Sequence, residues 1–242
     1  MKILLTNDDG VFAEGLKALR DILQALGEVF VVAPDRERTA ISHALTLHRP
    51  LRVKEWDERT FAVDGTPADC IHLGLFRLLP SKPDLVISGI NNGPNMGEEV
   101  FYSGTVAAAL EASFLDLPAF AISLAARNDH RYLTAAQVAL RVAQAILRHG
   151  LPRGVFLNIN VPNQEVGALR GFKITRLGKR IFDNSVVEEV DPRGRRYYWI
   201  GGKEPQFFMV EGSDYEAITQ GYISVTPLRG DLSDYQMMEV LE

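Results

Sequence analysis

Two adjacent carboxylates, Asp8 and Asp9, stand between the apolar run KILLT and Gly10. At the end of a buried strand, neighbouring carboxylates repel each other, and a divalent cation removes that repulsion. Gly10 permits a tight turn that would aim both side chains at one point. The pair fits equally well a turn in which one Asp caps the next helix and the other is solvated. As a metal site with oxygen ligands only, it favours Mg²⁺ or Mn²⁺ over Zn²⁺.

A second candidate feature is Ser103-Gly104-Thr105, which opens an alanine-rich run with helical character. The unpaired N–H groups and the positive dipole end of a helix N-terminus form a natural phosphate site. The hydroxyls of Ser103 and Thr105 would add donors to it. A plain N-cap explains the same residues, since helices often begin with Ser or Thr. The polar, glycine-rich segment 89–95 precedes this run and is typical of a ligand loop or of a long connection.

A third polar segment, DRERTAISHALT at 35–46, offers the hydroxyls of Thr39 and Ser42 and the imidazole of His43. His43 is the one histidine placed near the candidate site, and a lone histidine is more often structural than catalytic. The other four histidines show no metal-ligand spacing.

These segments follow strands in a chain that alternates strands and helices over its first two-thirds. Buried strands are predicted at 2–6, 28–34, 84–89, 119–124 and 155–162. Helical spacing covers 13–26, 103–116 and 132–148, and Thr66-Pro67 marks a further helix start. The runs 51–56 and 60–65 suggest an antiparallel excursion. The pattern predicts an α/β fold with a mostly parallel sheet covered by helices on both faces. Ligands bind beyond the carboxyl ends of such strands, where the three candidate segments lie.

The alternation of strands and helices does not continue after residue 162. Glycines become frequent, and the strands expected at 172–177, 196–201, 206–210 and 222–228 are short. Between residues 170 and 203, nine basic side chains stand against four acidic ones. We therefore predict a catalytic core over 1–162 and a C-terminal extension over 163–242. The extension would carry a β-hairpin arm for oligomerisation and return in part to the core.

Composition narrows the function classes. The 242 residues are 46% hydrophobic and 24% charged, which is typical of globular proteins, and the formal net charge is −5. An acidic total argues against a dedicated nucleic-acid binder. With one cysteine no intrachain disulfide forms, and no run reaches the roughly 18 apolar residues that a membrane span needs. We expect a soluble, cytoplasmic protein with no membrane partner.

Eight stretches, taken together in this order, resemble the stationary-phase survival protein SurE family. They cover the chain from residue 3 to about 228, and NDDG, SGINNGPN and YSGT at these separations are the most specific. The stretches are ILLTNDDG, VVAPDRER, GTPADC, LVISGINNGPNMG, YSGTVAAALE, LNINVP, RYYWIGG and GYISVTPL.

The resemblance implies a Rossmann-like fold whose C-terminal β extensions assemble a homodimer or homotetramer. It implies a phosphoric monoester hydrolase, a metal-dependent 5′-nucleotidase and often also a 3′-nucleotidase, acting on nucleoside monophosphates. Carried over by position, the ligands of one divalent ion per subunit (Mg²⁺ or Mn²⁺) are Asp8, Asp9, Thr39 and Asn91. The residues that would line the phosphate pocket are Asn95, Ser103, Gly104 and Thr105. The family usually has Ser-Gly after DRxR where this chain has Thr39-Ala40; threonine keeps the hydroxyl, and Ala40 is expected to alter the loop.

The mechanistic hypothesis places Asp8 and Asp9 as catalytic residues that hold the metal ion. The ion would polarise the phosphoryl group and activate a bound water molecule. The neutral oxygens of Thr39 and Asn91 leave the loaded site near zero charge, which favours a phosphate dianion. Direct attack by Asp8 through an aspartyl phosphate is the other route. It is less favoured because a carboxylate that holds a metal is a poorer nucleophile.

Three other classes of protein share some of these sequence features. A phospho-accepting receiver domain also has an acidic pair at the end of its first strand. In this chain, however, Gly89 stands at the position where a receiver carries the Asp that accepts the phosphoryl group. A dehalogenase-type phosphatase needs a second Asp where Gly10 stands. A nucleic-acid-binding module fits the basic segment 170–203 no better than an oligomerisation arm does.

Overall fold

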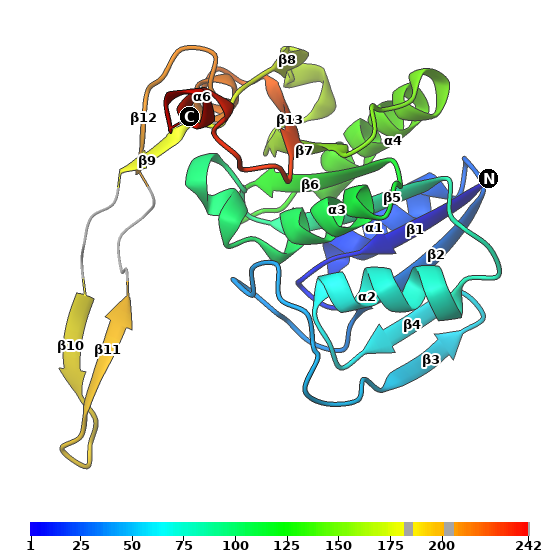
Figure 1. Ribbon diagram of the computed structural model, residues 1–242, viewed down its shortest axis with the longest axis horizontal. Helices are drawn as coiled ribbons and strands as arrows, with labels where there is room; N and C mark the ends of the chain where they lie inside the picture. Colours follow the sequence, from blue (N-terminus) through cyan, green and yellow to red (C-terminus); the bar gives the residue numbers. More distant parts are fainter. Residues whose placement is uncertain (182–185, 201–205, 242) are drawn as a thin grey trace.

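The computed structural model describes residues 1–181, 186–200 and 206–241. Within them, nine strands form one sheet in the order β3-β4-β2-β1-β5-β6-β7-β13-β8 (Figure 1). These strands are β1 (Lys2–Thr6), β2 (Glu28–Pro34), β3 (Val53–Asp57), β4 (Thr60–Val63), β5 (Leu85–Asn92), β6 (Ala119–Ala125), β7 (Val155–Pro162), β8 (Phe172–Ile174) and β13 (Ile223–Arg229). Neighbours from β4 to β7 run parallel, whereas β3 and β13 are antiparallel to β4 and β7. The predicted mostly parallel sheet is confirmed.

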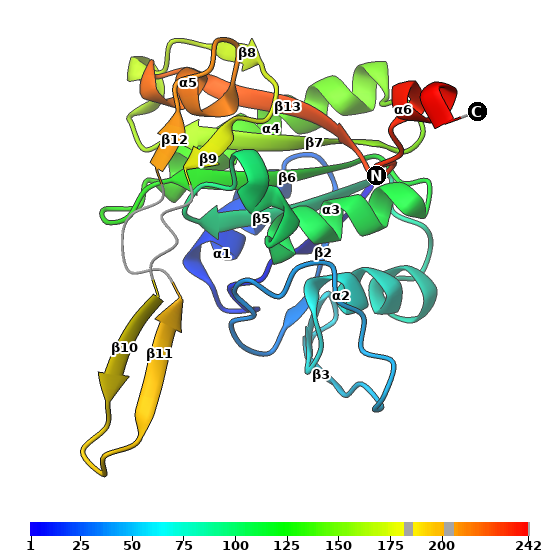
Figure 2. The same ribbon diagram turned by 60° about the vertical axis from the view of Figure 1, so that its left-hand side comes forward.

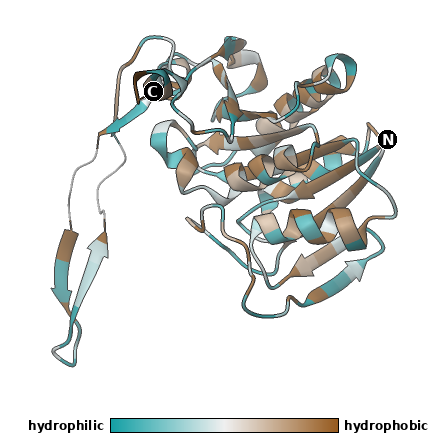
Figure 3. Ribbon diagram, viewed as in Figure 1, coloured by the Kyte–Doolittle hydropathy of each residue, from teal (hydrophilic) through white to brown (hydrophobic). Residues whose placement is uncertain are grey.

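Helices cover both faces of this sheet, as predicted. On one face, α1 (Glu14–Leu23) and α4 (Tyr132–His149) pack against the sheet through residues such as Leu16 and Leu19. On the other face, α2 (Pro67–Leu73) and α3 (Gly104–Phe114) do so through Ile71 and the small side chains of α3. Figure 3 shows apolar residues gathered on the central strands between these layers. The core therefore lies in two layers, with the sheet between them.

The helix start predicted at Thr66-Pro67 is confirmed. Thr66 caps α2 by accepting a hydrogen bond from the N–H of Asp69, and the Asp69 carboxylate accepts one from the N–H of Thr66. This reciprocal pair satisfies two N–H groups that a helix start leaves without a partner. Shorter helical turns follow at Gly74–Leu78, Gly97–Phe101 and Val166–Ala168.

The C-terminal part both joins the sheet and leaves it. β8 and β13 extend the sheet beyond β7, while β9 (Lys179–Ile181) pairs with β12 (Gln206–Phe208). The hairpin of β10 (Val186–Val190) and β11 (Arg196–Ile200) projects away from the body (Figure 2), and all ten of its strand residues are exposed. The short helices α5 (Asp214–Thr219) and α6 (Tyr235–Leu241) were not predicted.

Parts of two predictions fall outside the described residues. They are Gly201 at the end of the strand expected at 196–201, and Asp183 and Lys203 of the basic segment. The division into 1–162 and 163–242 stays a prediction, although β7 ends at Pro162. In the part of the chain that the structure describes, no helix is both long enough and apolar enough to cross a bilayer.

Candidate active site

The ends of β1 and β5 bring the acidic pair and the asparagine loop together. The two strands are parallel neighbours, with Thr6 opposite Ser88, so the residues that follow them emerge at one edge of the sheet. The Asn7 side chain donates to the carbonyl of Gly10 at 2.9 Å and accepts from its N–H at 3.2 Å. Gly10 adopts a φ of +104°, which favours glycine. This closed turn fixes where Asp8 and Asp9 point.

Asp8 is enclosed by the start of α3. Its side chain is buried, and its Oδ1 accepts a hydrogen bond from the hydroxyl of Thr105. A Cβ on Gly104 would lie 2.9 Å from Asp8 Cβ and 3.0 Å from Ile41 Cγ2, so the close approach of α3 requires glycine. Burial raises the pKa of Asp8, while hydrogen bonds from Thr105 and from the backbone of Gly104 oppose that rise. The helix N-terminus therefore faces a carboxylate of the protein itself.

Asp9 lies beside Asp8 and is more exposed. Its Oδ2 accepts a hydrogen bond from the N–H of Asn92 at 3.2 Å. Burial, and then the charge of Asp8, raise the pKa of Asp9 from 3.8 to about 6. Burial is the larger cause, and the repulsion predicted for two adjacent carboxylates adds to it; a bound cation would lower the pKa again.

Asn91 is oriented toward this pair. Its Nδ2 donates to the carbonyl of Gly93 at 2.8 Å, while its Oδ1 lies 3.2 Å from the Thr105 hydroxyl. Because Thr105 also reaches Asp8, the hydroxyl places the Asn91 oxygen near the carboxylate. An amide oxygen, which hard cations accept as a ligand, therefore lies beside the hydroxyl that holds Asp8.

The loop after β2 carries Thr39 to the same cavity. The N–H of Arg38 donates to the carbonyl of Asp8 at 2.7 Å, and the Thr39 hydroxyl donates to the Glu37 carboxylate. Ala40 has a φ of +54°, the left-handed conformation that glycine adopts at least cost. The Thr39-Ala40 departure from the usual family residues therefore falls at a position where the backbone itself favours glycine.

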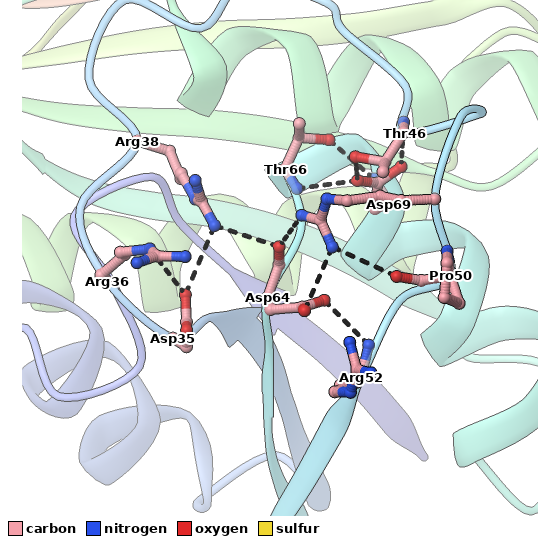
Figure 4. A network of polar contacts seen from close by, with 10 residues as sticks. Asp35, Arg36, Arg38, Thr46, Pro50, Arg52, Asp64, Thr66 and Asp69 are labelled. Atoms are coloured by element: carbon pink, nitrogen blue, oxygen red, sulfur yellow. Dashed lines mark hydrogen bonds and ion pairs between the residues drawn. The ribbon is translucent and has the colours of Figure 1, made fainter.

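Polar contacts with α2 and with the turn before it hold this loop in place (Figure 4). A guanidinium N–H of Arg38 donates to the carbonyl of Asp64 at 3.1 Å. The Asp69 carboxylate accepts from the Thr46 N–H at 2.9 Å and from its hydroxyl at 2.6 Å. Contacts on both sides of Thr39 therefore hold the loop against the body.

A cavity of about 460 Å³ joins these segments. Six of the eight predicted site residues line it, namely Asp8, Asp9, Thr39, Asn91, Asn95 and Ser103. The structure differs for Gly104 and Thr105, which do not line it: Thr105 is fully buried, with its hydroxyl turned to Asp8, and Gly104 packs against Asp8. The N-cap interpretation of Ser103 also holds, since its Oγ accepts from the Val106 N–H at 3.1 Å.

Asn95 is held by a network of buried polar side chains. Its N–H donates to Asn160 Oδ1 and its Nδ2 to Ser123 Oγ, each at 2.8 Å. The Nδ2 groups of Asn158 and Asn160 both donate to the Asn95 carbonyl, at 2.8 and 3.0 Å. The ends of β6 and β7 thus fix the far wall of the cavity, because buried polar groups keep their partners.

Several cavity residues were not predicted as site residues: Glu37, Ala40, Asn92, Pro94, Glu99, Tyr102 and Arg180. Among the described residues that line the cavity, Arg180 is the only Lys or Arg. It arrives on β9, at the base of the arm, and its Nη1 lies 3.9 Å from Glu99 Oε1. The one sequence signal for Arg180 was its place in the basic segment. Four carboxylates line the cavity, so its field attracts a cation.

The donor set fits a hard cation and argues against a zinc cage. In the part of the chain that the structure describes, no three His, Cys, Asp or Glu side chains gather to form a metal site. The cavity instead offers two adjacent carboxylates, an amide oxygen and a hydroxyl. Oxygen ligands of mixed charge suit Mg²⁺ or Mn²⁺.

Comparison with known proteins gives matches along the whole chain. The family model described as survival protein SurE matches residues 3–184. The chain is 52% identical over 243 residues to a protein of Geotalea uraniireducens named 5′-nucleotidase SurE, covering 100% of this chain and 98% of that protein. A protein with the same name from Geobacter sulfurreducens is 53% identical over 244 residues, with 100% and 93% covered.

A solved structure agrees with these matches. The crystal structure of the SurE protein from Aquifex aeolicus superimposes with a TM-score of 0.90 at 44% identity, covering 100% of this chain and 98% of that one. The resemblance stated from the motifs is confirmed, and the receiver-domain alternative gains no support. The chain belongs to the survival protein SurE family.

Proposed function

We propose that this protein hydrolyses nucleoside monophosphates to nucleoside and phosphate, as a metal-dependent 5′-nucleotidase that also accepts 3′-nucleotides. The observation that carries the proposal is the adjacent pair Asp8 and Asp9, with raised pKa values, at the head of a polar cavity. The name that both relatives carry, 5′-nucleotidase SurE, supports the substrate class.

One divalent ion per subunit would be held by Asp8, Asp9, Thr39 and Asn91. When bound, such an ion supplies Lewis acidity toward the phosphoryl group and activates water. Two carboxylates and two neutral oxygens leave the loaded site near zero charge, which suits an incoming phosphate dianion. Mg²⁺ and Mn²⁺ are the candidates, because the donors are oxygens.

The chain's own residues would place the phosphate against that ion. Ser103 and Asn95 line the cavity on the side of α3 and β7 and offer hydrogen bonds to phosphate oxygens. Arg180 would balance part of the negative charge as it redistributes in the transition state. Thr105 and Gly104 do not line the cavity, and their proposed role is to hold Asp8 in position. The Thr105 hydrogen bond to Oδ1 orients the Asp8 carboxylate, which supports its proposed role as a metal ligand.

Self-association and location belong to the same proposal. The exposed β10–β11 hairpin presents Tyr197, Tyr198, Trp199 and Ile200 to its surroundings, and apolar exposure of this kind favours burial against another copy. We propose a homodimer or homotetramer formed through this arm. The cytoplasmic location predicted from composition stays a prediction.

The direct test is phosphate release from a panel of nucleoside monophosphates with Mg²⁺, Mn²⁺ or EDTA. We expect turnover of 5′-nucleotides with either ion and none in EDTA. A generic phosphate ester such as p-nitrophenyl phosphate serves as the control for substrate class. Activity that persists in EDTA, or equal rates on every phosphate ester, would contradict the proposal.

A further inference from the structure

Three titratable side chains outside the cavity lining meet near the C-terminal end of α3. His43 Nε2 lies 2.5 Å from Glu111 Oε2, and His72 Nε2 lies 2.7 Å from Glu111 Oε1. Glu111 comes from α3, His72 from α2 and His43 from the loop that carries Thr39. One carboxylate therefore joins three segments that are far apart in the sequence.

The chemistry of this cluster fixes the role of each member. The Glu111 side chain is only 8% exposed, so its two oxygens need donors. Hydrogen bonds from His43 first, and then from His72, hold the pKa of Glu111 below its usual range despite burial. Glu111 is therefore a carboxylate at neutral pH, and each imidazole donates through Nε2. Phe114 packs against the His43 ring, with centroids 5.8 Å apart.

The loop between Thr39 and His43 cannot hold its shape by itself. Ala40 and Ser42 adopt φ values of +54° and +57°, which side chains disfavour. Such backbone persists only where contacts around it over-determine it. Ser42 supplies two of these contacts, from its hydroxyl to the Phe101 carbonyl at 2.6 Å and from its N–H to the Tyr102 carbonyl at 3.0 Å. His43 supplies the next one along the chain, to Glu111.

We propose that His43, held by Glu111, is a positioning residue that sets the Thr39 hydroxyl for the metal ion. This inference rests on the proposed metal site. The Arg38 N–H bound to the Asp8 carbonyl fixes the loop before Thr39, and the His43–Glu111 contact fixes it after Thr39. α3 carries both ends of the arrangement, because Thr105 at its start holds Asp8 and Glu111, further along it, holds His43.

His72 provides a matched control for this role. It donates to the other oxygen of the same carboxylate and has a similar side-chain exposure, 37% against 30% for His43. It lies on α2, however, outside the Thr39 loop. Removing either imidazole leaves Glu111 one donor short, but only the loss of His43 also removes a contact that holds the Thr39 loop.

The test is calorimetric titration of Mn²⁺ into full-length wild type, His43→Ala, His72→Ala and His43→Gln, each checked for folding by circular dichroism. We expect the Mn²⁺ Kd to rise about tenfold in His43→Ala and to change by less than about twofold in His72→Ala. His43→Gln keeps an N–H donor for Glu111 and should restore most of the affinity. If His43→Ala does not fold, His43→Asn takes its place with the same expected rise.

The outcomes separate this inference from the function on which it rests. If wild type binds no Mn²⁺, the proposed metal site itself is wrong. If wild type binds and His43→Ala binds equally well, only the positioning role is overturned. An equal loss in His43→Ala and His72→Ala also overturns it, because it would show that the cluster acts through general stability.

Discussion

The Thr105 hydroxyl donates a hydrogen bond to Oδ1 of Asp8 and lies 3.2 Å from Oδ1 of Asn91. The residue at the start of α3 that was predicted to bind phosphate thus holds one proposed metal ligand, Asp8, and lies beside a second, Asn91. Thr105 is fully buried, so its hydroxyl has no access to a phosphate in the cavity. We therefore propose that phosphate contacts come from residues that line the cavity, Ser103 and Asn95 among them.

Replacing Thr105 by Val should weaken metal binding. Valine matches threonine in shape but removes the donor, which leaves the buried Asp8 carboxylate short of a partner. We expect the Mn²⁺ Kd to rise about 10-fold or more and the free energy of unfolding to fall by about 1–3 kcal/mol. Calorimetric titration and urea unfolding measure the two quantities. Thr105→Ser keeps the hydroxyl, so a loss as large as that of Thr105→Val would argue against the hydrogen bond as the cause.

A methyl group at Gly104 should push the start of α3 away from Asp8. The added Cβ would lie 2.9 Å from Asp8 Cβ, closer than carbon atoms pack, so the helix start must shift. We expect a stability loss of about 1–3 kcal/mol and a lower kcat. Gly167→Ala is the control, because a Cβ there meets nothing within 4 Å. Comparable activity in the two variants would show that the close approach at Gly104 is not needed.

The metal-free protein should be destabilised as the pH rises through the titration of Asp9. Its pKa is raised from 3.8 to about 6, chiefly by burial and then by Asp8. Between these two values the folded state binds more protons than the unfolded state, so the stability contributed by the neutral carboxyl is lost as pH increases. At pH 7 in EDTA, Asp9→Asn should raise the free energy of unfolding by about 2 kcal/mol, since partial exposure screens part of the effect.

Urea unfolding at pH 4 and pH 7 checks this prediction. At pH 4 the difference between wild type and Asp9→Asn should nearly vanish, because Asp9 is already neutral in the folded protein. With saturating Mn²⁺ at pH 7 the order should reverse, since binding stabilises wild type. A variant less stable than wild type at pH 7 in EDTA would show that the charged Asp9 carboxylate does not destabilise the metal-free fold.

Glycine at position 40 should stabilise the loop. Ala40 adopts a φ of +54°, and removing its Cβ relieves the strain of the left-handed conformation, by about 1 kcal/mol. Urea unfolding of wild type and Ala40→Gly measures the increase in the free energy of unfolding. Ala44→Gly, in the same loop but without a positive φ, should lose stability through added chain entropy. A loss in both variants would show that the strain at Ala40 is absent.

The sequence predicted the layers of the fold and the edge at which the site lies, for a simple physical reason. Buried parallel strands are continuous apolar runs, and the residues after them share one edge of the sheet. Asp8, Asp9 and Asn91 could therefore be placed together from β1 and β5 alone. The short helices α5 and α6 were missed because each spans less than two full helical repeats, too little for a hydrophobic period to show.

The rest of the site depends on contacts between distant segments. Arg180 and Glu99 are 81 residues apart and meet only because β9 returns to the cavity rim. Glu111 sits within an apolar, alanine-rich helix, where nothing in the local pattern shows that two imidazoles approach it. Thr105 has the same hydroxyl whether it faces phosphate or Asp8, so its direction depends on how closely the start of α3 approaches Asp8.

In the proposed function, Asp8 and Asp9 hold the divalent metal ion on which phosphate release depends. The most direct measurement is the rate of phosphate release from a 5′-nucleoside monophosphate by wild type and Asp8→Asn, each in Mn²⁺, after EDTA, and after Mn²⁺ is restored. Wild type should lose activity in EDTA and regain it. The folded Asp8→Asn variant should be at least about a thousandfold slower throughout, equivalent to about 4 kcal/mol of transition-state stabilisation. An Asp8→Asn variant that turns over at the wild-type rate, with or without metal, would contradict the account.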